Sequence, residues 1–206
     1  MKRWGAGTAA VGVAAMVLSG VLSSASASAA ANAGVARSAG VSASTASTVS
    51  SPYFGTRYFN CYPEYGCAAS AVLPKNWRAI RLGTDHYRFA DRTAPRMIRI
   101  RMNLREEIST AAAAQRKQAA LRGTPGLKVL SRRTTTMNAG QGPLTMTTLV
   151  YTYRQGSTTR WVATRYLGMW GMTTPNVELT VGGRLPDRAL LTKVLAKATT
   201  SITLAG

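Results

Sequence analysis

Few residues in this sequence are of the types that carry acid–base or nucleophilic chemistry. The single histidine, His86, directly follows Asp85, and a carboxylate can orient an imidazole as a general base. No serine or cysteine stands in a recognisable nucleophile setting, and the G-x-S-x-G elbow is missing from the sequence. Glu106 and Glu107 could form an acid/base pair, but acids are common where helices start, and adjacent helical side chains do not face each other. We therefore expect no catalytic residue and a protein that is not an enzyme.

The two cysteines, Cys61 and Cys67, flank a turn that contains proline and glycine. In an exported chain this spacing predicts one disulfide between them. The alternatives are a free nucleophile, whose only available histidine base is His86, and a metal pair. A zinc site needs further soft ligands that the sequence lacks beyond that histidine. We expect no metal and no cofactor.

The N-terminus has the pattern of a secretion signal. Lys2 and Arg3 precede an apolar run from about residue 7 to residue 22, and small residues with A-x-A spacing follow. The run is shorter than the roughly 20 apolar residues of a membrane span. It has no nearby cysteine for a lipid anchor and no Arg-Arg pair for the twin-arginine route. The pattern predicts a Sec signal peptide and a secreted protein, with an uncleaved N-terminal anchor as the alternative.

Composition divides the chain into three parts. Residues 1–31 are the predicted signal peptide. Residues 32–52 are rich in Ala, Ser and Thr without periodicity, which predicts a disordered linker. Residues 53–206 form one predicted globular domain, which begins with an aromatic flap around the two cysteines. These aromatic residues could bind a sugar or a peptide, but aromatic side chains more often supply buried area.

The charge of the chain is strongly positive. The sequence has 26 Lys and Arg, 7 Asp and Glu, and a formal charge of +19. Removal of Lys2 and Arg3 with the signal peptide leaves 24 basic residues against the same 7 acidic ones, a charge of +17. The basic character therefore belongs to the exported protein. Net charge of this size favours association with anionic partners.

Hydrophobic periodicity predicts an α+β domain with a single antiparallel sheet of about six to seven strands, flanked by two helices. The clearest alternation is Met97–Leu104, with Arg99 and Arg101 on the outer side. Helices are predicted over residues 105–122, with acids near the start, and from Pro186 to about Thr199.

A hairpin is predicted over residues 144–169, with a type II′ turn at Gly156. Its register pairs Val150 with Ala163 and divides the side chains between an apolar face and a polar, tyrosine-rich face. Arg165 is the misfit on the apolar face, and we expect it to lie at an edge with its head group in solvent. The predicted binding residues come from the basic strand and the polar hairpin face: Arg99, Arg101, Tyr151, Tyr153, Arg160 and Tyr166.

The phrase Val72-Leu73-Pro74-Lys75-Asn76-Trp77 resembles the entry to the first strand of Mog1/PsbP-like domains. The order of the predicted strands and helices resembles that of the same family. Exported actinobacterial forms of that family include LpqN-type lipoproteins and proteins associated with type VII secretion. The resemblance covers roughly residues 70–204. It implies a sheet with helices on its faces and a non-catalytic binding or accessory role at the cell envelope. The chain departs from LpqN-type proteins in lacking the lipobox cysteine, and no functional residue carries over.

We therefore expect a secreted, non-enzymatic binding or accessory protein of the cell envelope, whose basic surface binds an anionic polymer or membrane surface. One alternative is a protein–protein interaction partner of an exported, secretion-associated complex. Another is a small secreted hydrolase. The charge could also reflect a compositional preference for arginine without any function. Such a preference explains why arginine outnumbers lysine, but it does not explain the small number of acidic residues.

Overall fold

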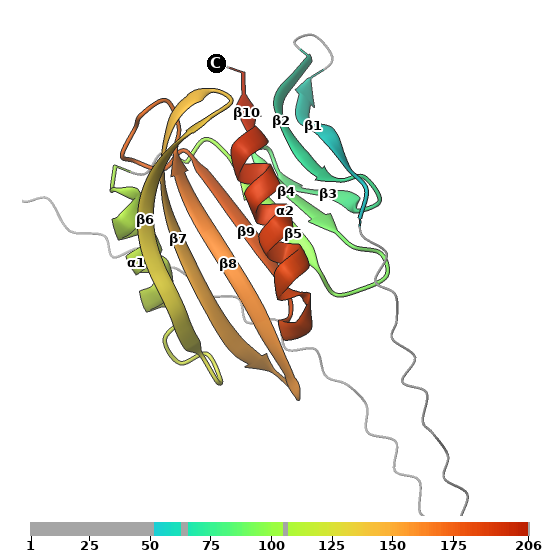
Figure 1. Ribbon diagram of the computed structural model, residues 1–206, viewed down its shortest axis with the longest axis vertical. Coiled ribbons are helices and arrows are strands. Elements are labelled where there is room, and N and C mark those ends of the chain that lie inside the picture. The colour runs from blue at the N-terminus through green and yellow to red at the C-terminus, as the bar shows by residue number, and fades with distance from the viewer. Residues whose placement is uncertain (1–51, 63–65, 105–106, 206) are drawn as a thin grey trace, which may run out of the picture. The chain divides into compact units, whose positions relative to one another are not determined.

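The structure is a computed structural model that describes residues 52–62, 66–104 and 107–205 (Figure 1). The predicted signal peptide and residues 32–51 of the predicted linker lie outside these residues. The side chains of Cys61 and Cys67 lie outside them as well, so the predicted disulfide stays a prediction. Among the described residues, no helix has the length and apolar character that crossing a membrane requires.

The described residues form two antiparallel sheets and two α-helices. The larger sheet has seven strands in the order β3-β4-β5-β9-β8-β7-β6. These strands are β3 (Arg78–Gly83), β4 (His86–Ala90), β5 (Met97–Arg101), β6 (Lys128–Ala139), β7 (Gly142–Gln155), β8 (Thr158–Gly168) and β9 (Val177–Arg184). The smaller sheet has three strands, β1 (Phe54–Tyr62), β2 (Gly66–Pro74) and β10 (Thr203–Leu204). The helices are α1 (Thr110–Ala120) and α2 (Arg188–Ser201), which a short 3-10 turn, η1 (Leu185–Asp187), precedes.

The prediction of a single sheet is wrong, because the aromatic N-terminal segment forms a β1–β2 hairpin that belongs to a second, smaller sheet. Strand β2 pairs with β1 on one side and with the C-terminal strand β10 on the other. In that second pairing Thr203 lies opposite Ser70, and their hydroxyl oxygens are 2.7 Å apart. The two ends of the domain are thereby joined in one small sheet, while the α+β class and the two helices agree with the prediction.

The β7–β8 hairpin has the predicted register. Val150 lies opposite Ala163, and Gly156 at the turn has a φ of 59°, which glycine adopts readily. Even-numbered β7 residues such as Met146 pack in the main core, whereas Tyr151 faces the other side. Arg165 does not reach an edge as expected. It donates to Thr148 Oγ1 at 3.2 Å and to Thr199 Oγ1 at 2.8 Å, beneath α2.

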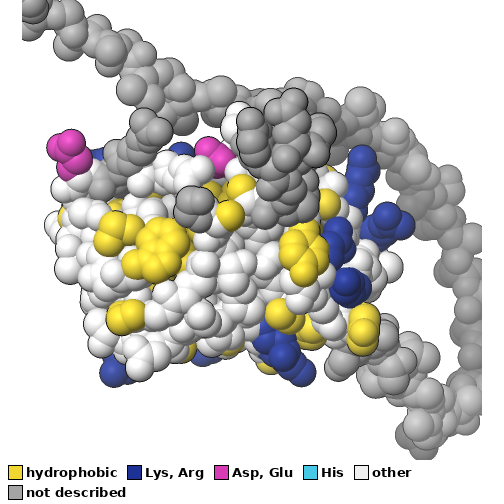
Figure 2. All heavy atoms as spheres, turned by 90° about the horizontal axis from the view of Figure 1, so that it is seen from above, with side chains coloured by type: hydrophobic (Ala, Val, Ile, Leu, Met, Phe, Trp, Pro, Cys, Tyr) yellow, Lys and Arg dark blue, Asp and Glu magenta, His cyan; other side chains and the backbone are white. Residues whose placement is uncertain are grey.

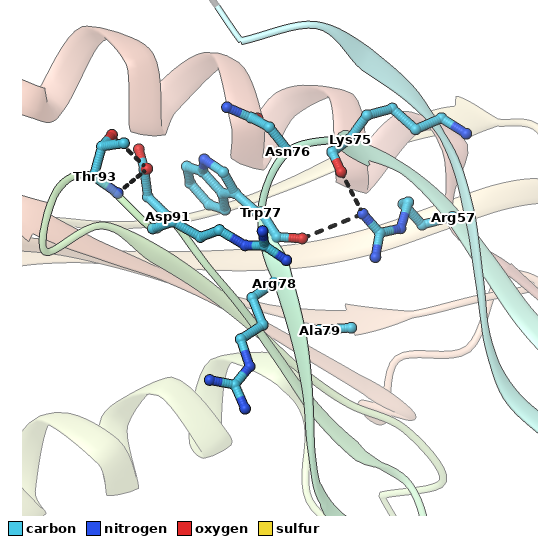
Figure 3. Close-up of a pocket in the computed structure, with 9 residues that line it drawn as sticks. Arg57, Lys75, Asn76, Trp77, Arg78, Ala79, Asp91 and Thr93 are labelled. Carbon is cyan, nitrogen blue, oxygen red and sulfur yellow. Dashed lines mark hydrogen bonds between the residues drawn. The ribbon is translucent and has the colours of Figure 1, made fainter.

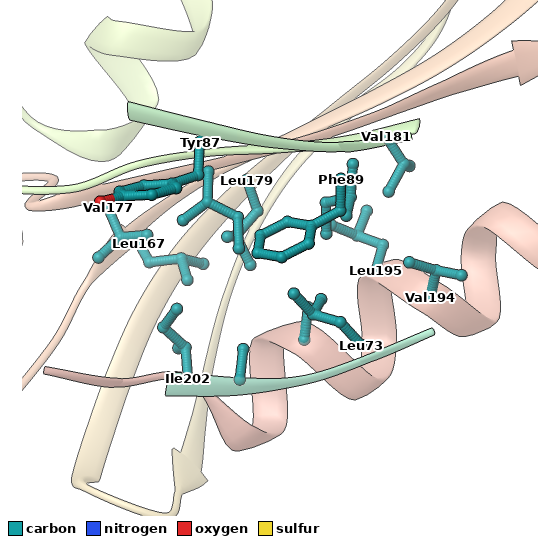
Figure 4. Close-up of a cluster of buried hydrophobic side chains, with 14 of the residues drawn as sticks. Leu73, Tyr87, Phe89, Leu167, Val177, Leu179, Val181, Val194, Leu195 and Ile202 are labelled. Carbon is teal, nitrogen blue, oxygen red and sulfur yellow. The ribbon is translucent and has the colours of Figure 1, made fainter. Parts of the chain in front are cut away.

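The main core lies between the seven-stranded sheet and the layer formed by α2 and β2 (Figure 4). Leu73, Phe89 and Leu195 meet there, and each is at most 2% exposed. Burial of such apolar side chains supplies most of the driving force for folding. This side of the sheet is therefore occupied by packing.

Helix α1 covers part of the opposite side, over β6, β7 and β8 (Figure 1). It begins later than predicted, because Ser109 is the N-cap and its hydroxyl accepts from the amide of Ala112. Its first turn contains no acidic residue, contrary to the prediction, and Glu107 precedes the cap. The small residues Ala113 and Ala114 are buried against the sheet, so the helix lies close to it.

Candidate functional site: a basic sheet face

Beside α1, the same side of the sheet carries a group of basic residues on β4 and β5. We call this group the basic face and define it as His86, Arg88, Arg99 and Arg101. Arg88 lies directly opposite Arg99, and His86 lies directly opposite Arg101. Arg99 in turn lies opposite Thr180 of β9, whose row continues to Leu149 under α1. The basic face is thus the continuation of the α1-covered surface.

Strand alternation produces this arrangement. Ile98 and Ile100 on β5 point into the main core and are fully buried, so Arg99 and Arg101 must point to the other side. Arg88 is exposed and alternates in the same way between the buried Tyr87 and Phe89. Two like charges directly opposite each other on adjacent strands destabilise a sheet. The pair Arg88–Arg99 is such an arrangement.

One carboxylate, Glu178 on β9, neutralises part of the charge. Its Oε1 is 3.0 Å from Arg99 Nη2, its Oε2 is 3.3 Å from Arg101 Nη1, and its side chain is 3% exposed. The hydroxyl of Thr180 also donates to Oε1 at 3.1 Å. Burial by itself raises the pKa of Glu178, but the positive charges of Lys117, Arg99 and Arg101 and the Thr180 hydrogen bond outweigh burial and lower it. Glu178 is therefore ionised at neutral pH.

Helix α1 adds a further cation to this group. Burial lowers the pKa of Lys117, the charge of Glu178 acts in the opposite direction, and Arg99 and Arg101 lower it further. One buried carboxylate thus faces three basic side chains from two elements. Arg88 has no carboxylate within ion-pair distance in the described part of the chain.

His86 borders this cluster but does not form the Asp85–His86 pair that its sequence position suggests. Asp85 Oδ1 accepts a hydrogen bond from Asn60 Nδ2 at 2.9 Å. Burial lowers the pKa of His86, and Arg99 and Arg101 lower it further, while Glu178 acts weakly in the opposite direction. The buried Nε2 has no hydrogen-bond partner within the described residues. His86 is therefore a neutral neighbour of the arginines at pH 7.

The predicted binding residues share one side of the sheet, but the structure places them in different surroundings. Arg99 and Arg101 lie on the basic face, with side chains 28% and 45% exposed. Tyr151 and Tyr166 are each 5% exposed and pack against α1. Burial, the main cause, raises the pKa of Tyr151 to about 12.

The other two predicted binding residues, Tyr153 and Arg160, lie opposite each other near the hairpin turn and are half-buried. The rings of Tyr151 and Tyr153 are 6.4 Å apart. Arg99 and Arg101 are thus brought together at the basic face, whereas the tyrosines contribute mainly to the packing beneath α1.

Glu178 and Lys117 are the site residues that the sequence reasoning missed. A signal for Glu178 exists in the sequence, because it is the only charged residue in the strand Val177-Glu178-Leu179-Thr180-Val181. Lys117 has no such signal, since a lysine on a polar helix is common. Among the described residues, no group of three or more His, Cys, Asp or Glu side chains could hold a metal ion.

Comparison with known proteins gives matches among solved structures at low sequence identity. No family model and no curated protein matches the sequence. Among solved structures, LpqN of Mycobacterium tuberculosis, described as involved in cell envelope biogenesis, is similar with a TM-score of 0.47 and 14% identity. The match covers 75% of this chain and 92% of LpqN. The protein of unknown function PA94 from Pseudomonas aeruginosa, a putative regulator, matches with a TM-score of 0.43 and 14% identity over 75% of this chain and 97% of its own. Both similarities are distant, and membership of the Mog1/PsbP-like family stays a prediction.

Proposed function

We propose that this chain is an exported, non-enzymatic binding protein of the cell envelope whose basic face binds an anionic polymer. The observation that carries the proposal is the direct opposition of Arg88 and Arg99 on adjacent strands. Because Glu178 already pairs with Arg99, the exposed Arg88 opposite it is the charge that no carboxylate of the described residues neutralises, and an anion bound there would relieve the repulsion between the two arginines. Export and location rest on the signal-like pattern of residues 1–31.

The charge balance around Glu178 supports the proposal. Glu178 forms ion pairs with both Arg99 and Arg101 and also feels the charge of Lys117, so one negative charge is set against three positive ones. Excess positive charge on a sheet face raises the local concentration of polyanions and the rate at which they bind. Because the charge is exposed, binding must weaken as salt increases.

The test measures binding of the secreted protein to heparin over a series of salt concentrations. The variant Arg88→Gln should lower the slope of log affinity against log salt by about 1, because it removes one contact to the polymer. The matched control is Arg133→Gln on the distant edge strand β6, an exposed arginine whose loss changes net charge equally. Binding that ignores salt, or equal losses in both variants, contradicts the proposal. Anionic liposomes in place of heparin show whether a membrane surface is bound instead.

A protein partner is the second candidate, and the β1 strand favours it. Tyr58 is 68% exposed and Tyr53, just before β1, is 77% exposed. Exposed tyrosines such as Tyr58 on this edge strand and Tyr53 next to it are typical anchors of protein interfaces. A pull-down from cell envelope at high salt separates the two: a partner that is retained at high salt and lost with Tyr58→Ser supports the protein interface.

A further inference from the structure

A cavity of about 550 Å³ lies where the two sheets meet (Figure 3). It is lined by Arg57 of β1, by the 75–77 turn, by the start of β3 and by residues 91–93 between β4 and β5. Its volume is in the range of small-molecule sites. The lining is unusual in its charge, because Arg57, Arg78 and Arg92 come to it from three separate segments.

Arg57 is fixed in place before any ligand arrives. Its Nη1 donates to the carbonyl oxygens of Lys75 at 2.8 Å and Trp77 at 3.2 Å. Its guanidinium carbon lies 5.3 Å from the centre of the Phe89 ring. These contacts use one nitrogen of the guanidinium and leave Nε and Nη2 for an acceptor in the cavity. A side chain held in this way loses little conformational entropy when it binds.

Among the described residues that line the cavity, Asp91 is the only carboxylate, and it already forms hydrogen bonds with other groups. Its Oδ1 accepts from the amide and the hydroxyl of Thr93, and its Oδ2 accepts from Arg96 Nε at 2.9 Å. Burial raises the pKa of Asp91, but the Thr93 and Arg96 hydrogen bonds outweigh burial and lower it. Arg96 lies outside the lining and neutralises this charge. Arg57, Arg78 and Arg92 have no carboxylate partner in the described part of the chain.

A second cavity of about 480 Å³ adjoins the first and shares Arg78, Asp91 and Arg92 with it. In Figure 3, Arg78 extends away from Arg57, so the two guanidinium groups lie in different parts of this surface. The second cavity also includes Ile80, which lies directly opposite Arg88 of the basic face. Figure 2 shows Lys and Arg side chains gathered at the right of the view, away from the acidic side chains at its upper left.

We infer that the Arg57–Arg92 cavity binds a phosphate group, and that Arg78 in the adjoining cavity takes the next phosphate of a phosphodiester polymer. Guanidinium groups match tetrahedral phosphate oxygens with paired hydrogen bonds, which a lysine surface does not offer. This inference deepens the proposed function, since it names the recurring group of the polymer that the basic face attracts. The inference can also hold without the proposed function, because a single free phosphate can bind in the first cavity alone.

The experiment titrates the full secreted protein with inorganic phosphate at constant ionic strength, and follows backbone amide signals by NMR. We expect shifts concentrated in residues 75–79 and 91–93. Arg92→Gln should weaken phosphate binding by about tenfold or more, because it removes a charge-assisted hydrogen bond. Arg92 is exposed and has no hydrogen bond or ion pair among the described residues, so its loss leaves the fold intact. Arg133→Gln is the control and should bind phosphate as the wild type does.

A second arm uses a short oligomer of glycerol phosphate. Tighter binding of the oligomer than of inorganic phosphate, lost with Arg78→Gln, identifies a phosphodiester polymer as the source. Equal affinities that both fall with Arg92→Gln identify free phosphate. Absence of localised shifts, or equal effects of Arg92→Gln and Arg133→Gln, overturns the inference even if heparin still binds through Arg88. Phosphate binding without heparin binding supports the cavity and overturns the proposed function instead.

Discussion

Arg99 on β5 and Glu178 on β9 form a 3.0 Å ion pair across two adjacent strands, and the carboxylate side chain is 3% exposed. The same carboxylate also contacts Arg101. One buried carboxylate thus neutralises part of the charge of two arginines on β5, which lies next to β4 and its arginine, Arg88. Glu178 therefore affects both the stability of the sheet and the net charge of the basic face.

The first prediction concerns the variant Glu178→Gln. It leaves Arg99, Arg101 and Lys117 without their counter-ion, and removal of one partner from a buried ion pair is strongly destabilising. Because Arg101 is 45% exposed, solvent reduces the cost, and we expect a loss of about 2–3 kcal/mol in the free energy of unfolding at pH 7. Urea unfolding measures it. The control is Glu107→Gln, an exposed acid, which should change stability little; equal losses would show that Glu178 has no special role.

The pH dependence of this loss gives a second check on Glu178. Its pKa is lower in the folded protein than its ordinary 4.5, so the unfolded chain takes up the proton first. The stability that it contributes is fully present above pH 4.5 and is lost as the pH falls through the folded pKa. The difference between wild type and Glu178→Gln should therefore shrink below pH 4.5. A difference that is constant down to pH 3 contradicts the lowered pKa.

The third prediction uses His86 as a reporter of the basic face. Because the chain has one histidine, its imidazole gives a single titration curve in a proton NMR spectrum. Burial and the charges of Arg99 and Arg101 lower the pKa of His86 below its ordinary 6.5. Since the folded pKa is lowered, stability from this group is present above pH 6.5 and falls as the pH drops below it.

Variants shift this titration in opposite directions. Arg101→Gln removes a positive charge and should raise the pKa of His86, whereas Glu178→Gln removes a negative charge and should lower it. A polyanion bound at the basic face should raise it, while one bound elsewhere should leave it unchanged. A titration at or above pH 6.5 in the free protein contradicts the buried, cationic surroundings of His86.

Much of the large sheet follows from local sequence patterns. The register Val150↔Ala163 follows from alternation and a glycine turn, both of which lie within 26 residues. The small sheet does not, because β10 has two residues and pairs with Ser70, 133 residues away in the sequence. So short a strand has no periodicity to detect. Alternation also placed Tyr151 on the side away from the main core, but could not show that α1 covers that side and buries it.

The fourth prediction concerns the disulfide. The backbone register places Cys61 directly opposite Cys67 in the β1–β2 pair. Directly opposed positions on antiparallel strands lie within the Cα separation that a disulfide spans. Mass spectrometry of the protein purified without reductant should find the pair oxidised, and Cys61→Ser with Cys67→Ser should lower the free energy of unfolding by roughly 2 kcal/mol, because the closed loop is short. The reduced wild type is the control and should match the double variant; two free thiols in the protein purified without reductant contradict the prediction.

The last prediction tests whether the basic face is functional or compositional. In Arg88→Glu a carboxylate replaces the cation opposite Arg99, so a repulsive pair on adjacent strands becomes an attractive one. Such pairs contribute about 0.2–1 kcal/mol, so urea unfolding should show a gain in stability. Heparin binding should nevertheless fall more than in the control Arg133→Glu, which changes net charge equally but lies opposite Thr148. A residue retained at a cost in stability and needed for binding is typical of a functional site. If Arg88→Glu stabilises the fold and leaves heparin binding equal to that of Arg133→Glu, the arginines of the basic face reflect composition alone.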